Sequence, residues 1–374
     1  MKYLYLILFC QDAVFAQFVG IKSQNEKEQE EDNCTKGCSD ANETIDYLIP
    51  PLLQNMSINT PFHSREEQEA APDDIFVEVL ITVDDKLYEL VGKSYSNGLW
   101  NNYLENPKLS IKHPTLPIGD PKNETILYLR KFMTAVNMRY QNLCTSPKIH
   151  LHITGMLIGE GTPFVKESID DKEGLDHSET VENMASHFGR ESFRKVHHFD
   201  IVLFITGEGK LCGKQCKSGK RSLGIAYVEG VCLESVDLTQ SVRTETYGVA
   251  LVSDNGVFKG VDTAAHEIGH LLGARHDGDN NCCCSDDGYI MSDIWNLQRY
   301  QKRNVHNWSS CSDKAFSKYF ATAKAAKCLY NKPSVTPYPL LEWEDLIAPN
   351  VPSLVEQCFL SRIELSTTGI FSSD

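Results

Sequence analysis

A short stretch in the last third of the chain, TAAHEIGHLLGARHDGDNN (residues 263–281), concentrates side chains that bind metal ions. His266 and His270 are four residues apart, so on an α-helix both imidazoles lie on one face and can reach a single cation. Glu267 lies one position further round the same helix, where it can act as a general base without being a ligand. This spacing predicts a zinc site.

The third histidine of the stretch requires a break in the helix. His276 is ten residues beyond His266, which on a straight helix would place it about 15 Å further along the axis. Gly273 can adopt the left-handed conformation that closes helices, so the chain can turn back and bring His276 to the same ion. Three protein nitrogens leave a fourth position for water, as in catalytic zinc sites. Zinc would activate that water and polarise a peptide carbonyl, while Glu267 passes the proton to the leaving amine.

The stretch resembles the extended zinc motif of the metzincin metalloproteases. HEIGHLLGARHD is followed by GYIMS, in which Met291 comes fifteen residues after His276, similar to the family's methionine turn. Asp277, directly after the third histidine, resembles the reprolysin or adamalysin branch, and the leader, short acidic segment and GYIMS are most similar to the secreted salivary metalloproteases of ticks. The resemblance implies a Cys232–Cys328 disulfide. It also implies three zinc ligands (His266, His270, His276), a catalytic base (Glu267) and structural residues near the site (Gly273, Asp277, Met291).

The segments around the motif alternate between strand and helix patterns. Residues 75–84, 148–159 and 199–207 predict strands, and residues 121–144, 178–193 and 309–328 predict helices. Two further apolar stretches, LGIAYVEGVC (223–232) and YGVALVSD (247–254), predict edge strands that line a cleft. The alternation indicates an α/β domain with packed helices on a mixed, mostly parallel twisted sheet. The resemblance adds an active-site helix and a methionine turn at a cleft, with residues 223–232 as the strand that binds extended substrate.

Composition divides the chain into four parts. Residues 1–16 have a lysine, an apolar run and a small residue at the end, and are predicted to be a signal peptide. Residues 17–72 are polar and acidic apart from one apolar run at 47–53, which predicts a short pro-segment or linker. Residues 73–330 are the expected reprolysin-like domain, and residues 331–374 are a proline-rich tail that resembles the start of a cysteine-rich region.

Charge and cysteine content bear on the compartment and the partners. The formal net charge of −15 argues against nucleic acid or an anionic membrane as partner, and no later segment is long and apolar enough for a membrane anchor. Removal of the leader with Cys10 leaves twelve of the 13 cysteines, an even number that favours disulfides in an oxidising compartment. We therefore expect an extracellular protein, glycosylated at sequons that lie at Asn33, Asn42, Asn55, Asn123 and Asn307.

Two groups of cysteines leave alternatives open. Cys34 or Cys38 is either a fourth metal ligand that keeps a precursor latent or half of a local disulfide. The run 282–284 either competes for metal or forms disulfides with Cys311 or another partner. The pair at 212 and 216 resembles half of a metal site, but no matching pair follows, so a bridged loop is expected.

The residues and the resemblance together predict a secreted zinc metalloendopeptidase that cuts internal peptide bonds of extracellular proteins. Similarity to the tick enzymes makes host matrix or clotting proteins such as fibrinogen the expected substrates. The rival hypothesis is a secreted binding protein that retains the fold and occupies a host receptor or clotting factor, although an intact Glu267 argues against it. The sequence gives no support for a calcium site and leaves the oligomeric state open.

Overall fold

The computed structural model describes residues 47–51, 72–96, 120–143, 147–169, 171, 174–214, 216, 222–237, 242–293, 302, 304–333 and 338–341. The predicted signal peptide, Cys34, Cys38, the first three sequons and the tail after residue 341 lie outside the described residues. Within them, no helix combines the length and the apolar character needed to cross a membrane.

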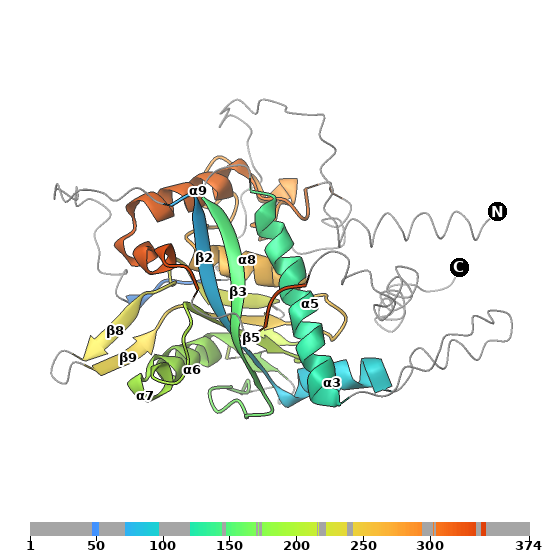
Figure 1. The fold of residues 1–374 in the computed structure, drawn as a ribbon. Coiled ribbons are helices and arrows are strands. Elements are labelled where there is room, and N and C mark those ends of the chain that lie inside the picture. The colour runs from blue at the N-terminus through green and yellow to red at the C-terminus, as the bar shows by residue number, and fades with distance from the viewer. Residues whose placement is uncertain are drawn as a thin grey trace, which may run out of the picture.

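A mixed six-stranded sheet forms the centre of the domain, in the order β1-β7-β10-β5-β2-β3. Its strands are β1 (Tyr47–Leu48), β2 (Asp74–Val83), β3 (Lys148–Ile158), β5 (Ile201–Thr206), β7 (Gly224–Tyr227) and β10 (Val249–Ser253). The pairs β10–β5, β5–β2 and β2–β3 are parallel, whereas β7 runs antiparallel to β10. The predicted mostly parallel α/β sheet is therefore confirmed, and Figure 1 shows its neighbouring strands β2 and β3 side by side.

Two expectations about the sheet were wrong. The stretches 223–232 and 247–254 were predicted to be edge strands, but the first contains β7, which lies between β1 and β10, and the second contains β10, which lies between β5 and β7. Val249, Leu251 and Val252 are fully buried there, and the helices α6 (His177–Gly189) and α8 (Val261–Leu271) both contact the strand. A continuous apolar run is the pattern of a strand covered on both faces, so the composition of this short run indicates a central strand and not an edge strand.

Helices pack around the sheet. They are α3 (Asp85–Ser96), α5 (Pro121–Gln141), α6 (His177–Gly189), α7 (Glu191–Arg194), α8 (Val261–Leu271) and α9 (Ser310–Thr322), with 3-10 turns η2 (Ser285–Asp287) and η4 (Lys324–Tyr330). Two small sheets complete the described part, β4 (Leu175–Asp176) with β6 (Leu211–Cys212), and β8 (Glu234–Asp237) with β9 (Val242–Thr246). Figure 1 shows the β8–β9 hairpin next to α6 and α7.

Helix α5 begins where its sequence places a capping group and a proline. The Asp120 carboxylate accepts a hydrogen bond from the Lys122 amide, and Pro121 occupies the first turn, where no amide donor is needed. Near its other end the Tyr140 hydroxyl donates to the carbonyl of Ala265 in α8 at 2.8 Å. The indole of Trp308 donates to the Arg139 carbonyl at 2.9 Å. Helix α5 therefore supports α8 along one side.

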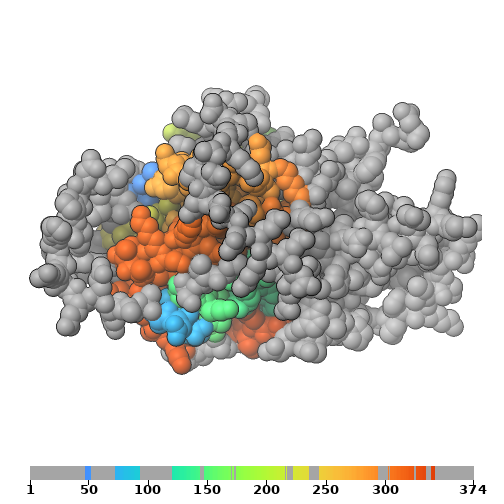
Figure 2. Space-filling model, turned by 90° about the horizontal axis from the view of Figure 1, so that it is seen from above, coloured from blue at the N-terminus to red at the C-terminus, as the bar shows by residue number. Residues whose placement is uncertain are grey.

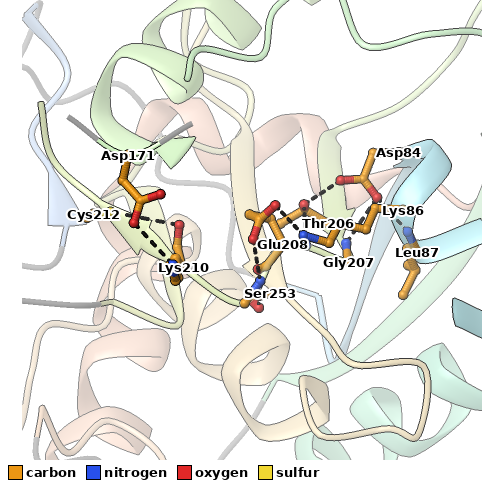
Figure 3. Close-up of polar contacts among 11 residues, drawn as sticks. Asp84, Lys86, Leu87, Asp171, Thr206, Gly207, Glu208, Lys210, Cys212 and Ser253 are labelled. Carbon is orange, nitrogen blue, oxygen red and sulfur yellow. Dashed lines mark hydrogen bonds and ion pairs between the residues drawn. The ribbon is translucent and has the colours of Figure 1, made fainter. Parts of the chain in front are cut away.

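The carboxyl ends of β2 and β5 are tied together by a single aspartate (Figure 3). Asp84 Oδ1 accepts from the amides of Leu87 at 2.8 Å and Gly207 at 3.0 Å, and its other oxygen accepts from the Thr206 hydroxyl. A Cβ on Gly207 would lie 2.5 Å from the Leu87 nitrogen, so the close approach needs glycine. The turn into α3 is thereby fixed to the neighbouring strand.

Three disulfides confirm the expectations made for the domain. They join Cys212 to Cys216, Cys232 to Cys328, and Cys283 to Cys311. Cys282 and Cys284 are also disulfide-bonded, so none of the three consecutive cysteines is a free thiolate for metal. The bridge between Cys232 and Cys328 joins the turn after β7 to η4, 96 residues later in the chain.

Part of the proline-rich tail packs on the domain. Tyr338 forms an antiparallel bridge with Ile153 of β3. The Arg130 side chain donates to the Pro339 carbonyl at 2.8 Å, and the Leu341 amide donates to the Thr134 hydroxyl at 3.0 Å. Residues 338–341 therefore contact the outer edge of β3 at Ile153 and lie along α5.

Candidate metal centre

Helix α8 is held at its first turn by a buried carboxylate. Asp254 accepts from the Gly260 amide at 2.7 Å, the Gly256 amide at 2.9 Å and the Tyr128 hydroxyl. Burial raises the pKa of Asp254, and these donors act against that increase by stabilising the charged form. Every residue from Val261 to Leu271 is buried, so the helix passes through the interior and has little freedom to shift.

Helix α8 ends at Leu271, and Gly273 follows two residues later. Its φ angle is 98°, and its amide donates to the His270 carbonyl at 2.9 Å while the Ala274 amide donates to the Gly269 carbonyl at 2.9 Å. A Cβ at this position would lie 2.9 Å from Cγ of Tyr319, so both conformation and space require glycine. The chain turns back after this residue and carries His276 toward the helix.

The three histidines converge on one point. The Nε2 atom of His276 lies 3.1 Å from that of His266 and 3.2 Å from that of His270. The Nδ1 atom of His266 is 2.7 Å from the Ile290 carbonyl, and that of His270 is 2.8 Å from the Ala274 carbonyl. A carbonyl only accepts hydrogen bonds, so Nδ1 carries the proton in both rings and Nε2 presents a lone pair.

This arrangement fits a divalent metal ion. A tetrahedral zinc ion with Zn–N distances of about 2.0–2.1 Å separates its nitrogen ligands by about 3.3–3.4 Å, close to the separations found here. Burial, together with the neighbouring His266 and His276, lowers the pKa of His270 well below its ordinary value, and burial also lowers the pKa of His276. Neutral imidazole is the form that binds metal. The group formed by His266, His270 and His276 could therefore hold a metal ion.

Glu267 lies beside the histidines, against the first residue of β7. Its side chain is buried, and a Cβ added to Gly224 would lie 2.6 Å from Glu267 Oε1 and 2.8 Å from Thr263 Cγ2. Glycine at this point of the strand is what leaves room for the carboxylate. Strand β7 and helix α8 are thus in direct contact at the residue predicted to be the base.

The methionine predicted to lie beneath the site is fully buried. A Cβ on Gly269 would be 3.0 Å from Met291 Sδ and 3.1 Å from the Trp308 ring, so α8 packs closely on both side chains through its glycine. The Asp277 amide donates to the Met291 carbonyl at 2.9 Å, and Asp277 Oδ1 accepts from the Ser309 hydroxyl at 2.6 Å. Asp277 therefore joins the turn after His276 to the segments that contain Met291 and Ser309.

A buried charge network that the motif does not reveal crosses from α5 to α8. Arg139 Nε lies 2.8 Å from Asp262 Oδ1, and His306 Nδ1 lies 3.0 Å from Asp262 Oδ2. Burial acts to raise the pKa of Asp262, but Arg139 and His306 outweigh it and hold that pKa below its usual range. The network lies one turn before His266 and fixes the first half of the helix.

Tyr47 is another residue of the site that sequence reasoning missed. Its ring centroid lies 4.9 Å from that of His270 and 5.3 Å from that of His276. Its hydroxyl donates to Asp279 Oδ2 and accepts from Arg275 Nη1 at 3.3 Å. Burial and the hydrogen bond to Asp279 raise the pKa of Tyr47 to about 12. The available signal was the apolar run at 47–53 within an otherwise polar segment.

A second cluster of potential ligands does not form a comparable centre. Asp200, Cys232 and Cys328 bring ligand atoms within 4.8 Å of one another, but the two sulfurs are joined in a disulfide. Metal ligation by cysteine requires the thiolate, so this cluster has no sulfur ligand to offer. Burial, opposed by a hydrogen bond from the Glu78 amide, raises the pKa of Asp200 to about 7.

The mixed sheet, the buried helix with two histidines, the break at glycine and the buried methionine below it define a metzincin-type fold. Residues 126–277 match the model of the family described as Metallo-peptidase family M12B Reprolysin-like. The chain therefore contains a reprolysin-type metzincin domain.

Similar proteins carry metalloproteinase names. A Bombyx mori protein named "A disintegrin and metalloproteinase with thrombospondin motifs like" is 30% identical over 72% of this chain and 35% of its own length. Venom metalloproteinase 2 of Eulophus pennicornis is 26% identical over 57% of this chain and 42% of its own length. Snake venom metalloproteinase fibrolase of Macrovipera lebetinus is 31% identical over 30% of this chain and 48% of its own length. The chain thus spans less than half of each of these relatives.

Proposed function

We propose that this chain is a secreted zinc metalloendopeptidase that hydrolyses internal peptide bonds of extracellular proteins, with matrix or clotting proteins such as fibrinogen as substrates. The observation that carries the proposal is the convergence of three imidazole Nε2 atoms beside the buried carboxylate of Glu267. The family match and the names of the relatives support the same class of reaction.

In this proposal His266, His270 and His276 hold the zinc ion. Zinc, when bound, supplies a Lewis acid that polarises a peptide carbonyl and lowers the pKa of water to about 7. The backbone carbonyls of Ile290 and Ala274 orient two of the imidazoles and fix the proton on Nδ1. Three ligands from the protein leave one position for the reacting groups.

Glu267 moves the proton. Its carboxylate takes a proton from the attacking water and later gives it to the nitrogen of the leaving amine. The carboxylate is confined between α8 and Gly224 of β7, so its position is set by packing and little reorganisation is needed during the reaction. Asp277 and Met291 keep the turn that carries His276 in place below the site.

Strand β7 is the proposed binding strand for substrate. It pairs with β10 along one edge and with β1 along the other, so an extended peptide can pair with it through main-chain hydrogen bonds in place of β1. Because β7 contacts α8 at Glu267, a peptide on that edge runs past the histidines. Main-chain recognition of this kind tolerates many side chains, as expected for an endopeptidase.

The test compares the purified wild-type chain with Glu267→Gln, and uses Glu160→Gln at an exposed position as the matched control. We expect wild type and both variants to bind one zinc per chain, measured by elemental analysis. Hydrolysis of fibrinogen and of a quenched peptide library should fall by about 10²–10⁴-fold only in Glu267→Gln, because loss of a general base has that order of effect. A chelator should abolish hydrolysis and added zinc should restore it.

Two results would contradict the proposal. One is a folded, pure wild-type chain that binds no zinc. The other is equal hydrolysis by wild type and Glu267→Gln. A zinc-bound chain that hydrolyses nothing but binds a clotting protein equally well with either residue would favour the binding-protein hypothesis.

A further inference from the structure

A shallow hollow lies where helix α6 ends and α7 begins, on elements that contribute no residue to the metal centre. Its volume is about 240 Å³, and it is lined by His187, Arg190, Ser192, Phe193, Val196 and His197. Both helices lie at the lower end of Figure 1. Figure 2, seen from above, shows the other end of the molecule, where residues 47–51 are blue at the surface beside orange atoms from the later part of the chain. The hollow is therefore separate from the surface that carries residues 47–51.

The segment that forms the hollow is basic in an acidic chain. RESFRKVHH (190–198) contains three Arg or Lys residues, two histidines and one acidic residue, whereas the whole chain has a formal net charge of −15. The screening length at physiological ionic strength is about 8 Å, so the charges next to a bound group outweigh those on distant surfaces. A small anionic group can therefore bind here despite the overall charge.

Two of the three basic side chains are open to solvent. Arg190 and Lys195 are exposed, and neither has an ion-pair partner among the residues that the structure describes. Arg194 differs, because its guanidinium lies 2.7 Å from Glu234 Oε1, donates to the Phe199 carbonyl at 2.7 Å and lies 4.2 Å from the centroid of the Phe199 ring. Arg194 therefore holds the turn in place, while Arg190 and Lys195 are available to an anion.

The backbone of this turn is fixed by close packing and hydrogen bonds. A Cβ on Gly189 would lie 2.3 Å from Glu245 Cα, so α6 ends in close contact with β9. The Phe193 amide donates to the Arg190 carbonyl at 3.0 Å, and the His197 amide donates to the Phe193 carbonyl at 3.1 Å. The side chains around the hollow therefore project from a rigid support, and binding requires little ordering of the chain.

Flat rings form one wall of the hollow. The His197 ring stacks on the Phe193 ring with centroids 4.5 Å apart, and the His187 ring lies 5.7 Å from the same phenyl group. Burial and the Arg190 guanidinium lower the pKa of His187, so this positive charge lies near the imidazole. Val196 is 72% exposed and adds an apolar side chain at the rim. The hollow thus combines ring faces with a cationic side.

We propose that this hollow binds one unit of a sulfated polysaccharide, with Arg190 and Lys195 on the sulfate groups and the ring of His197 against the face of the sugar. The inference goes beyond the proposed function and does not depend on it, because no residue of the hollow belongs to the metal centre.

Size and chemistry favour a sulfated sugar over other anions. The hollow is smaller than the pockets of about 300–1,000 Å³ that enclose small molecules, so it suits one unit of a longer chain. Guanidinium and ammonium groups form charge-assisted hydrogen bonds with sulfate oxygens, and the Ser192 hydroxyl can donate another. The negative faces of aromatic rings pack against the C–H groups of a sugar. An acidic peptide supplies carboxylates but no flat C–H surface to cover the rings.

The experiment measures binding of a sulfated oligosaccharide to the full chain at about 0.15 M salt, the physiological ionic strength. The probe is a fluorescein-labelled heparin octasaccharide, followed by fluorescence polarisation. The comparison ligands are the same octasaccharide after removal of its sulfate groups and a labelled octaglutamate peptide.

Two double variants are compared with wild type. One carries Arg190→Gln with Lys195→Gln and changes the hollow. The matched control carries Lys122→Gln with Lys318→Gln, which removes two exposed positive charges elsewhere on the domain. The melting temperature of each protein is measured to verify folding.

We expect the control variant to bind the sulfated probe as wild type does. The variant of Arg190 and Lys195 should bind it at least about tenfold more weakly, because hydrogen bonds between charged groups are lost. Its dissociation constant should also depend less on salt, since fewer counterions are released on binding. His197→Ala should weaken binding by about threefold to tenfold through loss of the ring contact.

Three results would overturn the inference. The first is equal affinity of wild type and the variant of Arg190 and Lys195 for the sulfated probe, or no binding by wild type. The second is equal affinity of wild type for the sulfated and desulfated sugars. The third is tighter binding of octaglutamate than of the sulfated probe, lost in the same variant, which would assign the hollow to acidic peptides. If the double variant does not fold, Lys195→Gln decides, and unchanged binding by it would overturn the inference equally.

The outcome is independent of catalysis. Binding of the probe requires no hydrolysis, so wild type and Glu267→Gln should bind it equally. A chain that hydrolyses no protein can still confirm the sugar site, and an active peptidase that ignores the sulfated probe would keep the proposed function and lose the site.

Discussion

The buried pair formed by Arg139 and Asp262 allows the most quantitative prediction. Arg139 is 1% exposed and Asp262 is 6% exposed, and they meet at 2.8 Å, with His306 on the second carboxylate oxygen. Asp262→Asn keeps the shape but removes the charge, so the buried guanidinium loses the carboxylate that balances it. Breaking a buried pair in this way destabilises proteins by about 3–5 kcal/mol. At about 2–4 °C per kcal/mol for a domain of this size, the melting temperature should fall by about 6–20 °C.

Urea unfolding followed by tryptophan fluorescence provides the assay, since the Trp308 indole is hydrogen-bonded to the Arg139 carbonyl. The control is Asp171→Asn, which removes a partly exposed partner of Lys210 and should change stability by less than about 1 kcal/mol. Arg139→Met in the Asp262→Asn background should recover part of the loss, because no uncompensated charge remains. A loss below about 1 kcal/mol in Asp262→Asn, or simple additivity in the double mutant, would refute the reasoning.

Three further predictions concern the same helix and its surroundings. Gly273→Ala should lower both stability and zinc affinity, because alanine is strained at φ 98° and its Cβ would press on Tyr319. Calorimetry measures the stability and zinc titration measures the affinity, and an unchanged zinc affinity would contradict the prediction. Gly224→Ala should reduce kcat by about tenfold or more with zinc content unchanged, since its Cβ would displace Glu267; wild-type kcat in this variant would rule out the packing argument. Asp262 has a lowered pKa in the folded state, so it contributes stability that is present above the unfolded pKa of about 3.9 and is lost as the pH falls through the folded pKa. The unfolding free energy of wild type should therefore decrease more steeply in acid than that of Asp262→Asn. Identical pH profiles of the unfolding free energy in the two proteins would count against this argument.

Local features of the site could be predicted because they depend on neighbours in the sequence. The spacing of His266 and His270 fixes a shared helical face, and a single glycine at 273 supplies the turn that returns the chain. Strand patterns located β2, β3 and β5 to within a residue or two, since apolar periodicity reflects burial directly.

Contacts between distant segments could not be predicted in the same way. Tyr47 meets Asp279 across 232 positions, and Arg139 meets Asp262 across 123, so nothing in either local pattern indicates the partner. The sequence marks the first segment only as an apolar run among polar residues. The prediction that β10 is an edge strand was wrong for a related reason. The neighbours of a strand in a sheet are set by the whole fold and not by the sequence of the strand itself.

Short segments of the chain pair with part of β3 and part of β7, near the two edges of the large sheet. On one side Tyr338 bridges to Ile153, and on the other Leu48 accepts from Val228. An unpaired edge of a sheet exposes backbone amides and carbonyls that can pair with an edge strand of another molecule, which leads to association and aggregation. If β1 must leave β7 before a substrate peptide can pair with that strand, each molecule passes through an interval in which the edge of β7 is unpaired. Access of substrate to the sheet edge and resistance to aggregation therefore oppose each other in this domain. Aggregation through the unpaired edge increases with protein concentration.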